Sequence, residues 1–213
     1  MSQAARSTSH ASEQEARAVA EASRETTWEA PSFVRELFLG RLQLDLIHPQ
    51  PQPDADEQRR GKEFAARLER FLEEEVDAEQ IEREAKIPER VVQRLRELGA
   101  FGIKIPREYG GLGLSQYTYG RAMAMVGTKS GAIVALLSAH QSIGVPTPLK
   151  MFGTDEQKRR LLPRLAKGAI SAFALTEADV GSDPARMATT ATPTADGTAY
   201  LLNGEKLDRK SVV

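Results

Sequence analysis

The sequence predicts an α+β fold, in which an N-terminal all-helical domain precedes the first strands of an antiparallel β-domain. Two observations carry this prediction. Apolar residues recur at helical spacing through most of the chain, with charges of both signs on the opposite faces. Near Ala169 the spacing changes to that of extended segments and turns. Because helices and strands are segregated along the chain, separate layers are expected and not alternating βαβ units.

The predicted domains follow this change of pattern. Residues 1–30 are expected to form a mobile tail, residues 31–169 the helical domain, and residues 170–207 the start of the β-domain. The tail mixes Ala, Ser and Thr with glutamates, so it has neither the apolar core of a secretory signal nor the low acid content of a mitochondrial one. A cytoplasmic location is therefore expected.

The helical domain is predicted to open with a short helix at Pro31–Leu39. Phe33, Leu37 and Phe38 share one face of it, and the proline at its start has no amide that the helix would need. A proline-rich stretch at residues 49–53 then ends the segment.

Two strongly amphipathic helices follow. The first begins after Asp54, and the second opens at Pro88 and is expected to end at Gly99 or Gly102, where glycine can adopt positive φ. The apolar stripes are Phe64, Leu68, Phe71, Leu72 and Val76 in the first helix, and Val91, Val92, Leu95 and Leu98 in the second.

Further helices complete the predicted helical domain. Two lie at Ser115–Thr128 and Ala132–His140. The last begins near Asp155, because Thr154 and Gln157 have capping-box spacing and can each satisfy an amide of the first turn.

The β-domain is expected to begin as a meander. An apolar run at Ile170–Leu175 predicts its first strand, and the threonine-rich run Met187–Thr194 predicts another. Thr198–Leu202 is followed by Asn203-Gly204, which predicts a hairpin, and Asp196-Gly197 predicts a second tight turn.

Composition excludes several classes of function. The chain has 29 lysine and arginine residues against 30 aspartate and glutamate residues, so neither nucleic acid nor an anionic membrane is favoured. It has no cysteine, which excludes disulfides and thiolate metal sites, and no metal site is expected. The long uncharged run 130–149 contains His140, Gln141, glycines and prolines. A buried helix and its turn are therefore expected there in place of a membrane span.

The segment Phe173–Asp183 carries the most chemistry. An extended run enters a loop with hydroxyls on Thr176 and Ser182, carboxylates nearby, and Gly181 for close backbone approach. Such a loop can offer amides and hydroxyls to a phosphate or a ring carbonyl. It can equally be ordinary turn structure. The sequence has no phosphate-loop motif, and Gly110-Gly-Leu-Gly113 lacks the rest of a dinucleotide-binding fingerprint, so a nicotinamide cofactor is not expected.

This segment resembles the flavin-contacting segment of the acyl-CoA dehydrogenases, whose pattern is aromatic-x-x-Thr-Glu-x-x-x-Gly-Ser-Asp. The resemblance runs from about Ser32 to Leu207, and it is closest to the very-long-chain branch of that family. Other stretches that resemble the family are Leu98–Gly102, Pro106–Gly113, Ala139–Gly144, Phe152–Thr154, Leu162–Ala166 and Leu202–Lys206.

The resemblance implies an FAD site. The implied cofactor-binding residues are Phe173, Ala174, Leu175, Thr176, Gly181 and Ser182. Among them, Thr176 would place its hydroxyl near the reactive edge of the flavin ring, and Ser182 would also approach the thioester end of an acyl-CoA substrate. Glu177 and Asp183 are expected to shape the loop. His140 is expected to have a structural role.

The resemblance also implies an activity, the α,β-dehydrogenation of fatty acyl-CoA thioesters in β-oxidation. In the family, a carboxylate removes a proton beside the thioester carbonyl while a hydride leaves for the flavin. That carboxylate comes from a C-terminal helical bundle that is missing here, so no catalytic residue is assigned and this chain alone is expected to be inactive. An electron-transferring flavoprotein or similar acceptor and a homo-oligomer are implied for the full-length enzyme.

The last six residues, Asp208-Arg-Lys-Ser-Val-Val213, depart from the family pattern. Their codons can be written as a common sequencing adapter followed by a stop. We expect this tail to be an assembly artefact, and a natural frameshift or truncation is the alternative.

Other functions remain open at this point. An acyl-CoA oxidase or a flavin-dependent hydroxylase would use the same scaffold and differ in whether oxygen reaches the reduced flavin. A non-catalytic helical binding or assembly module would keep the fold without the chemistry.

Overall fold

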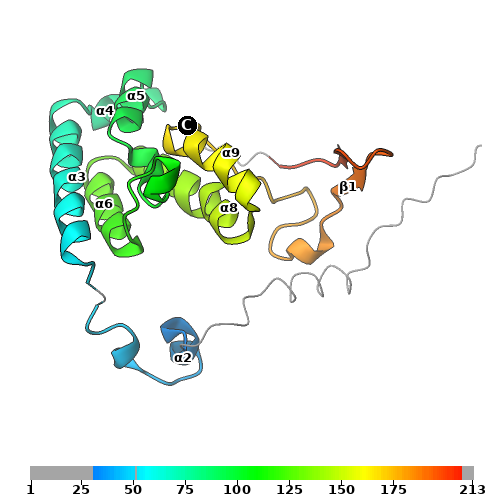
Figure 1. Cartoon of the computed structure of the whole chain (residues 1–213), viewed down its shortest axis with the longest axis horizontal. Helices are drawn as coiled ribbons and strands as arrows, with labels where there is room; N and C mark the ends of the chain where they lie inside the picture. The colour runs from blue at the N-terminus through cyan, green and yellow to red at the C-terminus, as the bar shows by residue number, and fades with distance from the viewer. Residues whose placement is uncertain (1–30, 51, 208–213) are drawn as a thin grey trace, which may run out of the picture. The chain divides into compact units, whose positions relative to one another are not determined.

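The computed structural model describes residues 31–50 and 52–207. The predictions for residues 1–30 and 208–213 therefore lie outside the described residues. Within the described residues, helices come first and a pair of antiparallel strands comes last (Figure 1). This order confirms the predicted α+β fold.

The described residues form two compact units. Residues 49–173 form one unit, which is built from helices and is called the helical unit below. Residues 31–48 and 174–207 belong to the other, which contains both strands and is called the strand unit.

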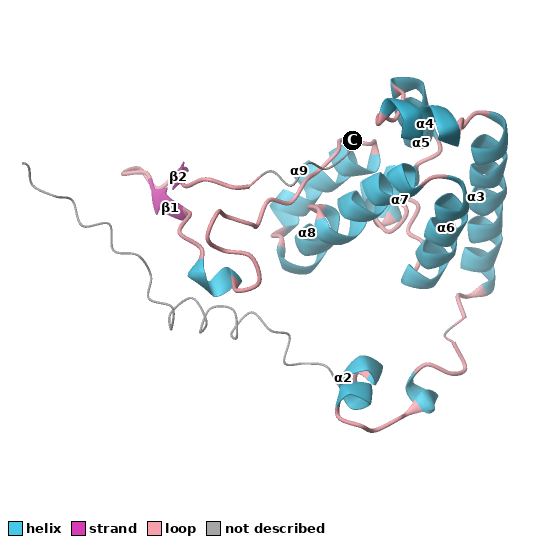
Figure 2. Ribbon diagram, turned by 180° about the vertical axis from the view of Figure 1, so that it is seen from behind, coloured by secondary structure: helices cyan, strands magenta, loops and turns pink. Residues whose placement is uncertain are grey.

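The helical unit contains the five helices predicted to begin near Asp54, Pro88, Ser115, Ala132 and Asp155, and also two short helices that the sequence analysis missed, α4 and α8 (Figure 2). Its elements are α3 (Ala55–Glu74), α4 (Ala78–Glu84), α5 (Glu89–Glu97), α6 (Gln116–Lys129), α7 (Gly131–Ser138), a π turn (Ala139–Ile143), α8 (Pro146–Phe152) and α9 (Asp155–Ala166), with 3-10 turns at Ala100–Gly102 and Arg107–Tyr109.

Polar side chains cap the starts of α3 and α9. The Asp54 carboxylate accepts the Glu57 amide at 2.8 Å and so satisfies one free donor of α3. The capping box of α9 is confirmed, because the Gln157 amide donates to the Thr154 hydroxyl and the Thr154 amide donates to the Gln157 side chain.

The apolar stripes predicted for α3 and α5 form the main core. Every residue of both stripes is buried in one cluster, which also takes in Val126 of α6 and Leu137 of α7. Burial of each large apolar side chain contributes about 1.5–3 kcal/mol. A smaller cluster joins α8 and α9 through Leu149, Leu162 and Leu165.

The glycine-rich loop at residues 106–113 folds back on the chain that precedes it. The Leu112 amide donates to the Gly102 carbonyl at 2.9 Å, and the Gly113 amide donates to the Ile105 carbonyl at 2.9 Å. A Cβ at Gly111 would lie 2.1 Å from the Ile105 carbonyl oxygen, so only glycine fits there. This loop therefore has a structural role.

One of the two glycines proposed as the end of α5 is confirmed. Gly99 follows that helix with φ of +77°, which is the left-handed conformation expected after a helix. Gly102 lies in the following 3-10 turn and does not have positive φ.

The stretch Gly131–Phe152 is, among the described residues, long and apolar enough to cross a membrane by length and composition. A buried core helix passes the same test, and 44% of the tested window is buried. Ile133, Leu136 and Leu137 lie in the main apolar core, as expected for a core helix.

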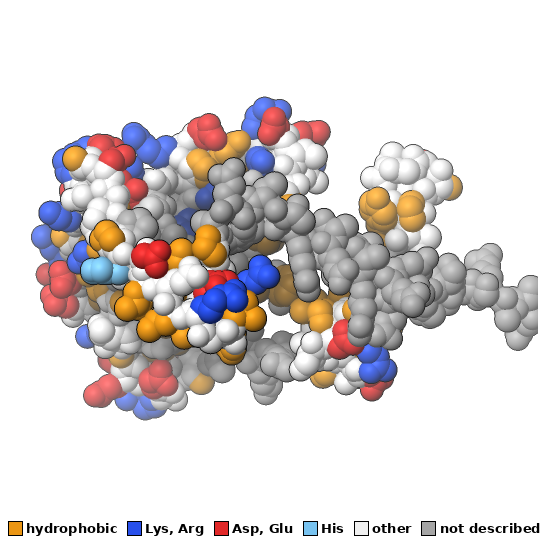
Figure 3. All heavy atoms as spheres, turned by 90° about the horizontal axis from the view of Figure 1, so that it is seen from below, with side chains coloured by type: hydrophobic (Ala, Val, Ile, Leu, Met, Phe, Trp, Pro, Cys, Tyr) orange, Lys and Arg blue, Asp and Glu red, His pale blue; other side chains and the backbone are white. Residues whose placement is uncertain are grey.

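The short helix α2 (Phe33–Phe38) of the strand unit confirms the predicted element but not its predicted apolar face. Leu37 is 50% exposed and Phe38 is 87% exposed, whereas the buried side chain is Glu36. Arg41 pairs with that carboxylate through two nitrogens. Figure 3 shows apolar side chains at the surface of the molecule.

The strand unit has one antiparallel pair among its described residues, β1 (Thr190–Pro193) and β2 (Tyr200–Asn203). The turn between them contains the predicted Asp196-Gly197, and Gly197 has φ of +68°. The hairpin predicted at Asn203-Gly204 is wrong within the described residues, because that dipeptide ends β2 and no described strand follows it.

The strand predicted at Ile170–Leu175 is also wrong. These residues have no regular secondary structure, and Ile170 and Phe173 are 48% and 59% exposed. An apolar run is typical of a buried strand only when a neighbouring strand satisfies its backbone, and no described strand pairs with this one.

Candidate functional site

The side chain of Glu177 organises the loop that follows the predicted flavin-contacting residues. It is 7% exposed. Its carboxylate accepts the Ala188 amide at 2.7 Å, the Thr189 amide at 3.1 Å, and the Thr189 hydroxyl. These bonds draw the chain around residue 188 against the loop. The prediction that Glu177 shapes the loop is therefore confirmed.

Lys206 binds the same carboxylate from a distant part of the sequence. Its Nζ lies 2.7 Å from Glu177 Oε1 and also donates to the Leu175 carbonyl at 3.1 Å. The next amide, that of Leu207, donates to the Thr176 carbonyl at 2.9 Å. The chain after β2 thus holds the backbone of residues 175–177.

The pKa of Glu177 is lowered to about 2, first because Lys206 donates to it and then because Thr189 and Ala188 do. Burial acts in the opposite direction but is outweighed. The carboxylate is therefore ionised at neutral pH, and its lone pairs are engaged within the loop. A general base needs a pKa near the working pH, so Glu177 is a structural group.

A tight turn follows Glu177. Glu177 and Val180 exchange two backbone hydrogen bonds, at 3.0 and 3.2 Å. Val180 is 7% exposed and anchors the far side of the turn. The next two residues, Gly181 and Ser182, are exposed.

The predicted cofactor-binding residues divide between the two units. Phe173 ends the stretch of residues 49–173 that forms the helical unit, and residues 174–182 lie in the strand unit. In the strand unit, Leu175 and Thr176 are half-buried on a backbone that Lys206 and Leu207 hold from one side.

The hydrogen-bond donors of the predicted cofactor-binding residues fit a flavin. Within the described part of the chain, the hydroxyls of Thr176 and Ser182 make no hydrogen bond, so both can donate to a ligand. A Cβ at Gly181 would meet no atom within 4 Å. The described fold therefore does not itself require glycine there, and the bare backbone leaves room for a close ligand.

The residues Ala139–Ile143 form a π turn whose polar side chains face different partners. The Gln141 side chain donates to the Ala100 carbonyl at 2.8 Å, and the Ser142 hydroxyl lies 3.1 Å from the Tyr119 hydroxyl. His140 is 1% exposed and contacts Ser171. These contacts join the π turn to three separate segments of the helical unit.

Two other carboxylates have structural roles as well. Burial raises the pKa of Glu57, but hydrogen bonds from Ser115 and Thr118 together lower it below its usual value. The hydrogen bond from Arg41 lowers the pKa of Glu36. Like Glu177, these groups are ionised and bonded within the fold, which does not suit a proton-abstracting base.

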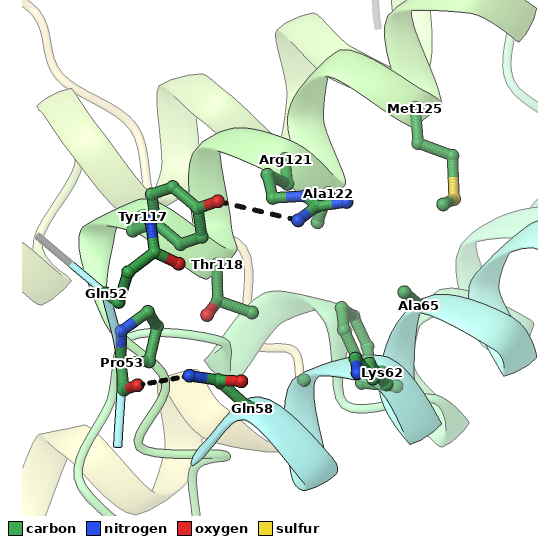
Figure 4. Close-up of a pocket in the computed structure, with 12 residues that line it drawn as sticks. Gln52, Pro53, Gln58, Lys62, Ala65, Tyr117, Thr118, Arg121, Ala122 and Met125 are labelled. Carbon is green, nitrogen blue, oxygen red and sulfur yellow. Dashed lines mark hydrogen bonds between the residues drawn. The ribbon is translucent and has the colours of Figure 1, made fainter. Parts of the chain in front are cut away.

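A pocket of about 230 Å³ lies between α3 and α6, away from the predicted cofactor residues in sequence (Figure 4). Lys62 and Arg121 line it, and no carboxylate does. The two helices are in close contact beside it, because a Cβ at Gly61 would lie 2.9 Å from Thr118 Cγ2. The remaining lining residues are Gln52, Pro53, Gln58, Phe64, Ala65, Tyr117, Ala122 and Met125.

The sequence profile of the acyl-CoA dehydrogenase N-terminal domain matches residues 58–169, which is most of the helical unit. The chain belongs to the acyl-CoA dehydrogenase family. The resemblance stated from the sequence motifs is thus confirmed, and residues 58–169 form the acyl-CoA dehydrogenase N-terminal domain.

Known acyl-CoA dehydrogenases are similar over nearly the whole chain. The "Probable acyl-CoA dehydrogenase FadE10" of Mycobacterium tuberculosis is 61% identical over 195 residues, which is 92% of this chain and 30% of that protein. The very long-chain specific mitochondrial acyl-CoA dehydrogenase of Mus musculus is 40% identical over 181 residues, which is 84% of this chain and 27% of that protein. The chain therefore spans about a third of the length of these relatives.

A solved structure agrees with the fold. The acyl-CoA dehydrogenase of Bacillus anthracis, complexed with FAD, is 32% identical and has a TM-score of 0.55. The match covers 73% of this chain and 26% of that one. The acyl-CoA dehydrogenase fold predicted from the motifs is thus confirmed for the helical domain and the strand pair.

Sequence reasoning missed Lys206 and Thr189 as parts of the loop. Lys206 belongs to a stretch that was recognised only as a family motif. The only signal for this contact was that Glu177 and Lys206, which pair in the structure, carry opposite charges on the two sides of a predicted hairpin. Sequence spacing alone does not reveal which of the 30 acidic residues a lysine will contact.

Proposed function

We propose that this chain supplies the N-terminal helical domain and the flavin-contacting segment of an FAD-dependent acyl-CoA dehydrogenase that oxidises fatty acyl-CoA thioesters. Family membership supports the reaction class. The observation that carries the proposal is the loop at Thr176–Ser182, whose backbone is held by Glu177 and Lys206 while its hydroxyls stay free among the described residues.

FAD is the proposed cofactor, and it would supply the acceptor for the hydride that leaves the substrate carbon. Leu175 would lie against the flavin ring, and Phe173 would flank it. The Thr176 hydroxyl would donate to the polar edge of the ring. Gly181 would let the backbone approach the pyrophosphate, and Ser182 would donate near the pyrophosphate and the acyl-CoA thioester.

The role of the described residues is positioning and not proton abstraction. Alignment of a substrate and a cofactor accelerates a reaction without any group of the loop changing its protonation state. The carboxylates of Glu177, Glu36 and Glu57 are engaged by Lys206, Arg41 and the start of α6, respectively. We therefore infer that the proton-abstracting carboxylate is none of these three, and that the 213-residue chain alone has negligible turnover.

The proposal extends to partners. The substrate would be a fatty acyl-CoA, and the reduced flavin of the full-length enzyme would pass electrons to an electron-transferring flavoprotein or a similar acceptor. Assembly as a homo-oligomer and a cytoplasmic location complete the proposal.

Binding of FAD by the purified chain tests this function. We expect wild-type protein to quench the fluorescence of added FAD and to retain a flavin absorption band after gel filtration. Thr176→Val removes the hydroxyl with little change of shape and should weaken FAD roughly fivefold to tenfold. Thr192→Val on the exposed β1 strand is the matched control and should bind FAD like the wild type.

Other outcomes separate the alternatives. A folded, colourless chain that takes up no FAD would contradict the cofactor assignment and favour a helical binding module. Anaerobic bleaching of the bound flavin by an acyl-CoA would contradict the proposed lack of turnover. Fast reoxidation by oxygen after chemical reduction would favour an oxidase.

A further inference from the structure

His140 makes a specific contact with the chain just before the predicted flavin-contacting residues. Its Nδ1 lies 3.2 Å from the Ser171 amide nitrogen and 3.0 Å from the Ser171 hydroxyl oxygen. The two residues are 31 positions apart in the sequence. The contact therefore ties the π turn to the segment that leads from α9 toward Phe173.

The donors around Nδ1 define the tautomer of His140. A backbone amide can only donate, so Nδ1 must accept from Ser171 and the neutral ring carries its proton on Nε2. The Ser171 hydroxyl accepts the Val145 amide at 3.1 Å, which leaves its own hydrogen free to reach Nδ1. Burial lowers the pKa of His140, against a smaller opposite effect of Phe101, and so favours the neutral ring.

Neighbouring residues fit closely around this contact. A Cβ at Gly144 would lie 2.5 Å from the His140 carbonyl oxygen and 2.6 Å from the Ser171 hydroxyl oxygen. The rings of His140 and Phe101 form a T-shaped pair, with centroids 5.3 Å apart and planes at 77°. His140 is thus held in one orientation, with Nδ1 toward Ser171.

The segment around Ser171 has few other restraints. The Ala169 amide donates to the Arg164 carbonyl at 3.0 Å. From residue 170 to residue 174, hydrogen bonds within the described part of the chain involve Ser171 alone. The position of the backbone before Phe173 therefore depends on the contact with His140.

We propose that His140 is a positioning residue for cofactor binding: by accepting the two hydrogen bonds that Ser171 donates, it fixes the backbone two residues before Phe173. This inference rests on the proposed function, because it assigns the fixed segment to the flavin site. His140 is not a catalytic residue in this proposal, since it acts through Ser171.

Matched substitutions of His140 in the full chain test the anchor. In His140→Asn, the side-chain oxygen takes the place of Nδ1 and can still accept from Ser171. In His140→Leu, no acceptor remains. We expect the Ser171 amide to exchange with solvent roughly tenfold faster in the Leu variant and nearly unchanged in the Asn variant. Equal exchange in wild type and the Leu variant would overturn the anchor.

Two further measurements keep the test decisive if the Leu variant does not fold. In wild-type protein, the ¹⁵N shifts of the His140 ring should show a bare Nδ1 and a protonated Nε2, and the opposite tautomer would overturn the assignment. Gly144→Ala should displace Ser171 and also raise its exchange rate. An unchanged rate in that variant would count against the proposal.

FAD titration separates this inference from the proposed function. The variants that free Ser171 should bind FAD at least about fivefold more weakly than wild type and His140→Asn. Wild-type affinity in a variant with a freed Ser171 amide would overturn the positioning role while leaving the function intact. A wild-type chain that binds no FAD would overturn the function, and the positioning role with it.

Discussion

Glu177 and Lys206 lie 29 residues apart in the chain, and their side chains meet at 2.7 Å at the base of the loop that carries Gly181 and Ser182. The contact also includes the Leu175 carbonyl, to which the same ammonium group donates. One ion pair therefore fixes both the start of the loop and the end of the hairpin.

Glu177→Gln should loosen this loop. The amide side chain keeps an acceptor oxygen but loses the charge that strengthens the bonds to Lys206 and Thr189. We expect the amides of Ala188 and Thr189 to exchange about tenfold faster, as followed by hydrogen–deuterium exchange. Glu205→Gln, at an exposed neighbouring glutamate, is the control and should leave these rates unchanged. Equal effects of the two variants would contradict the network.

The loop should also lose stability in acid. The native pKa of Glu177, about 2, lies below its usual value of 4.5, so the unfolded chain binds a proton more readily. The stabilisation is fully present above about pH 4.5 and is lost as the pH falls toward 2. A ¹³C titration of the carboxyl groups should give Glu177 a midpoint near 2. A midpoint near 4.5 would contradict the ion pair.

Gly111→Ala should destabilise the helical unit strongly, because the new Cβ would lie 2.1 Å from the Ile105 backbone oxygen. We expect a loss of about 3 kcal/mol or more in urea unfolding. Gly120→Ala is the matched control, since a Cβ there meets no atom within 4 Å. It should be neutral or stabilise α6 by about 0.5–1 kcal/mol. A well-tolerated Gly111→Ala would mean that the loop is not packed as described.

Phe64→Ala should test the core under α3. Phe64 is 2% exposed, and removal of such a side chain typically costs about 3–5 kcal/mol. Phe38→Ala, at a residue that is 87% exposed, should change the unfolding free energy of the helical unit by less than about 0.5 kcal/mol. Circular dichroism during urea titration measures both. A small effect of Phe64→Ala would place this ring outside the core.

The long helices could be predicted because two local signals agreed. In α3 and α5, the apolar spacing agreed with the starting residues Asp54 and Pro88, and the structure buries the predicted side chains. The start of α9 was predicted from its capping box alone. The short α4 has only one buried apolar residue, Ile81. The helix α8 begins two residues after Gly144 and contains two prolines. Neither offers a periodic stripe long enough to detect.

The strand unit was predicted less well because strands depend on distant partners. The run Ile170–Leu175 is apolar enough for a buried strand, yet its described neighbours are side chains such as His140 and Lys206 and not another strand. Similarly, Asn203-Gly204 has the composition of a hairpin turn, but the residues after it return toward Thr176. A local pattern does not contain this information.

The candidate site was predicted in part. The Phe173–Asp183 motif identified the loop from the sequence, and the structure confirms that Glu177 shapes it. The cofactor contacts of Thr176 and Ser182 stay predictions. His140 is buried, which is compatible with the expected structural role, but spacing alone could not identify Ser171 as its partner.

The π turn has a consequence for how the helical unit tolerates changes in length. Its closing bond runs from the Gly144 amide to the Ala139 carbonyl, at 2.7 Å, and so encloses one residue more than an α-helical turn. Deletion of one residue there could restore regular winding. The same deletion inside α3 would rotate every later side chain by about 100° about the axis and turn its apolar stripe outward.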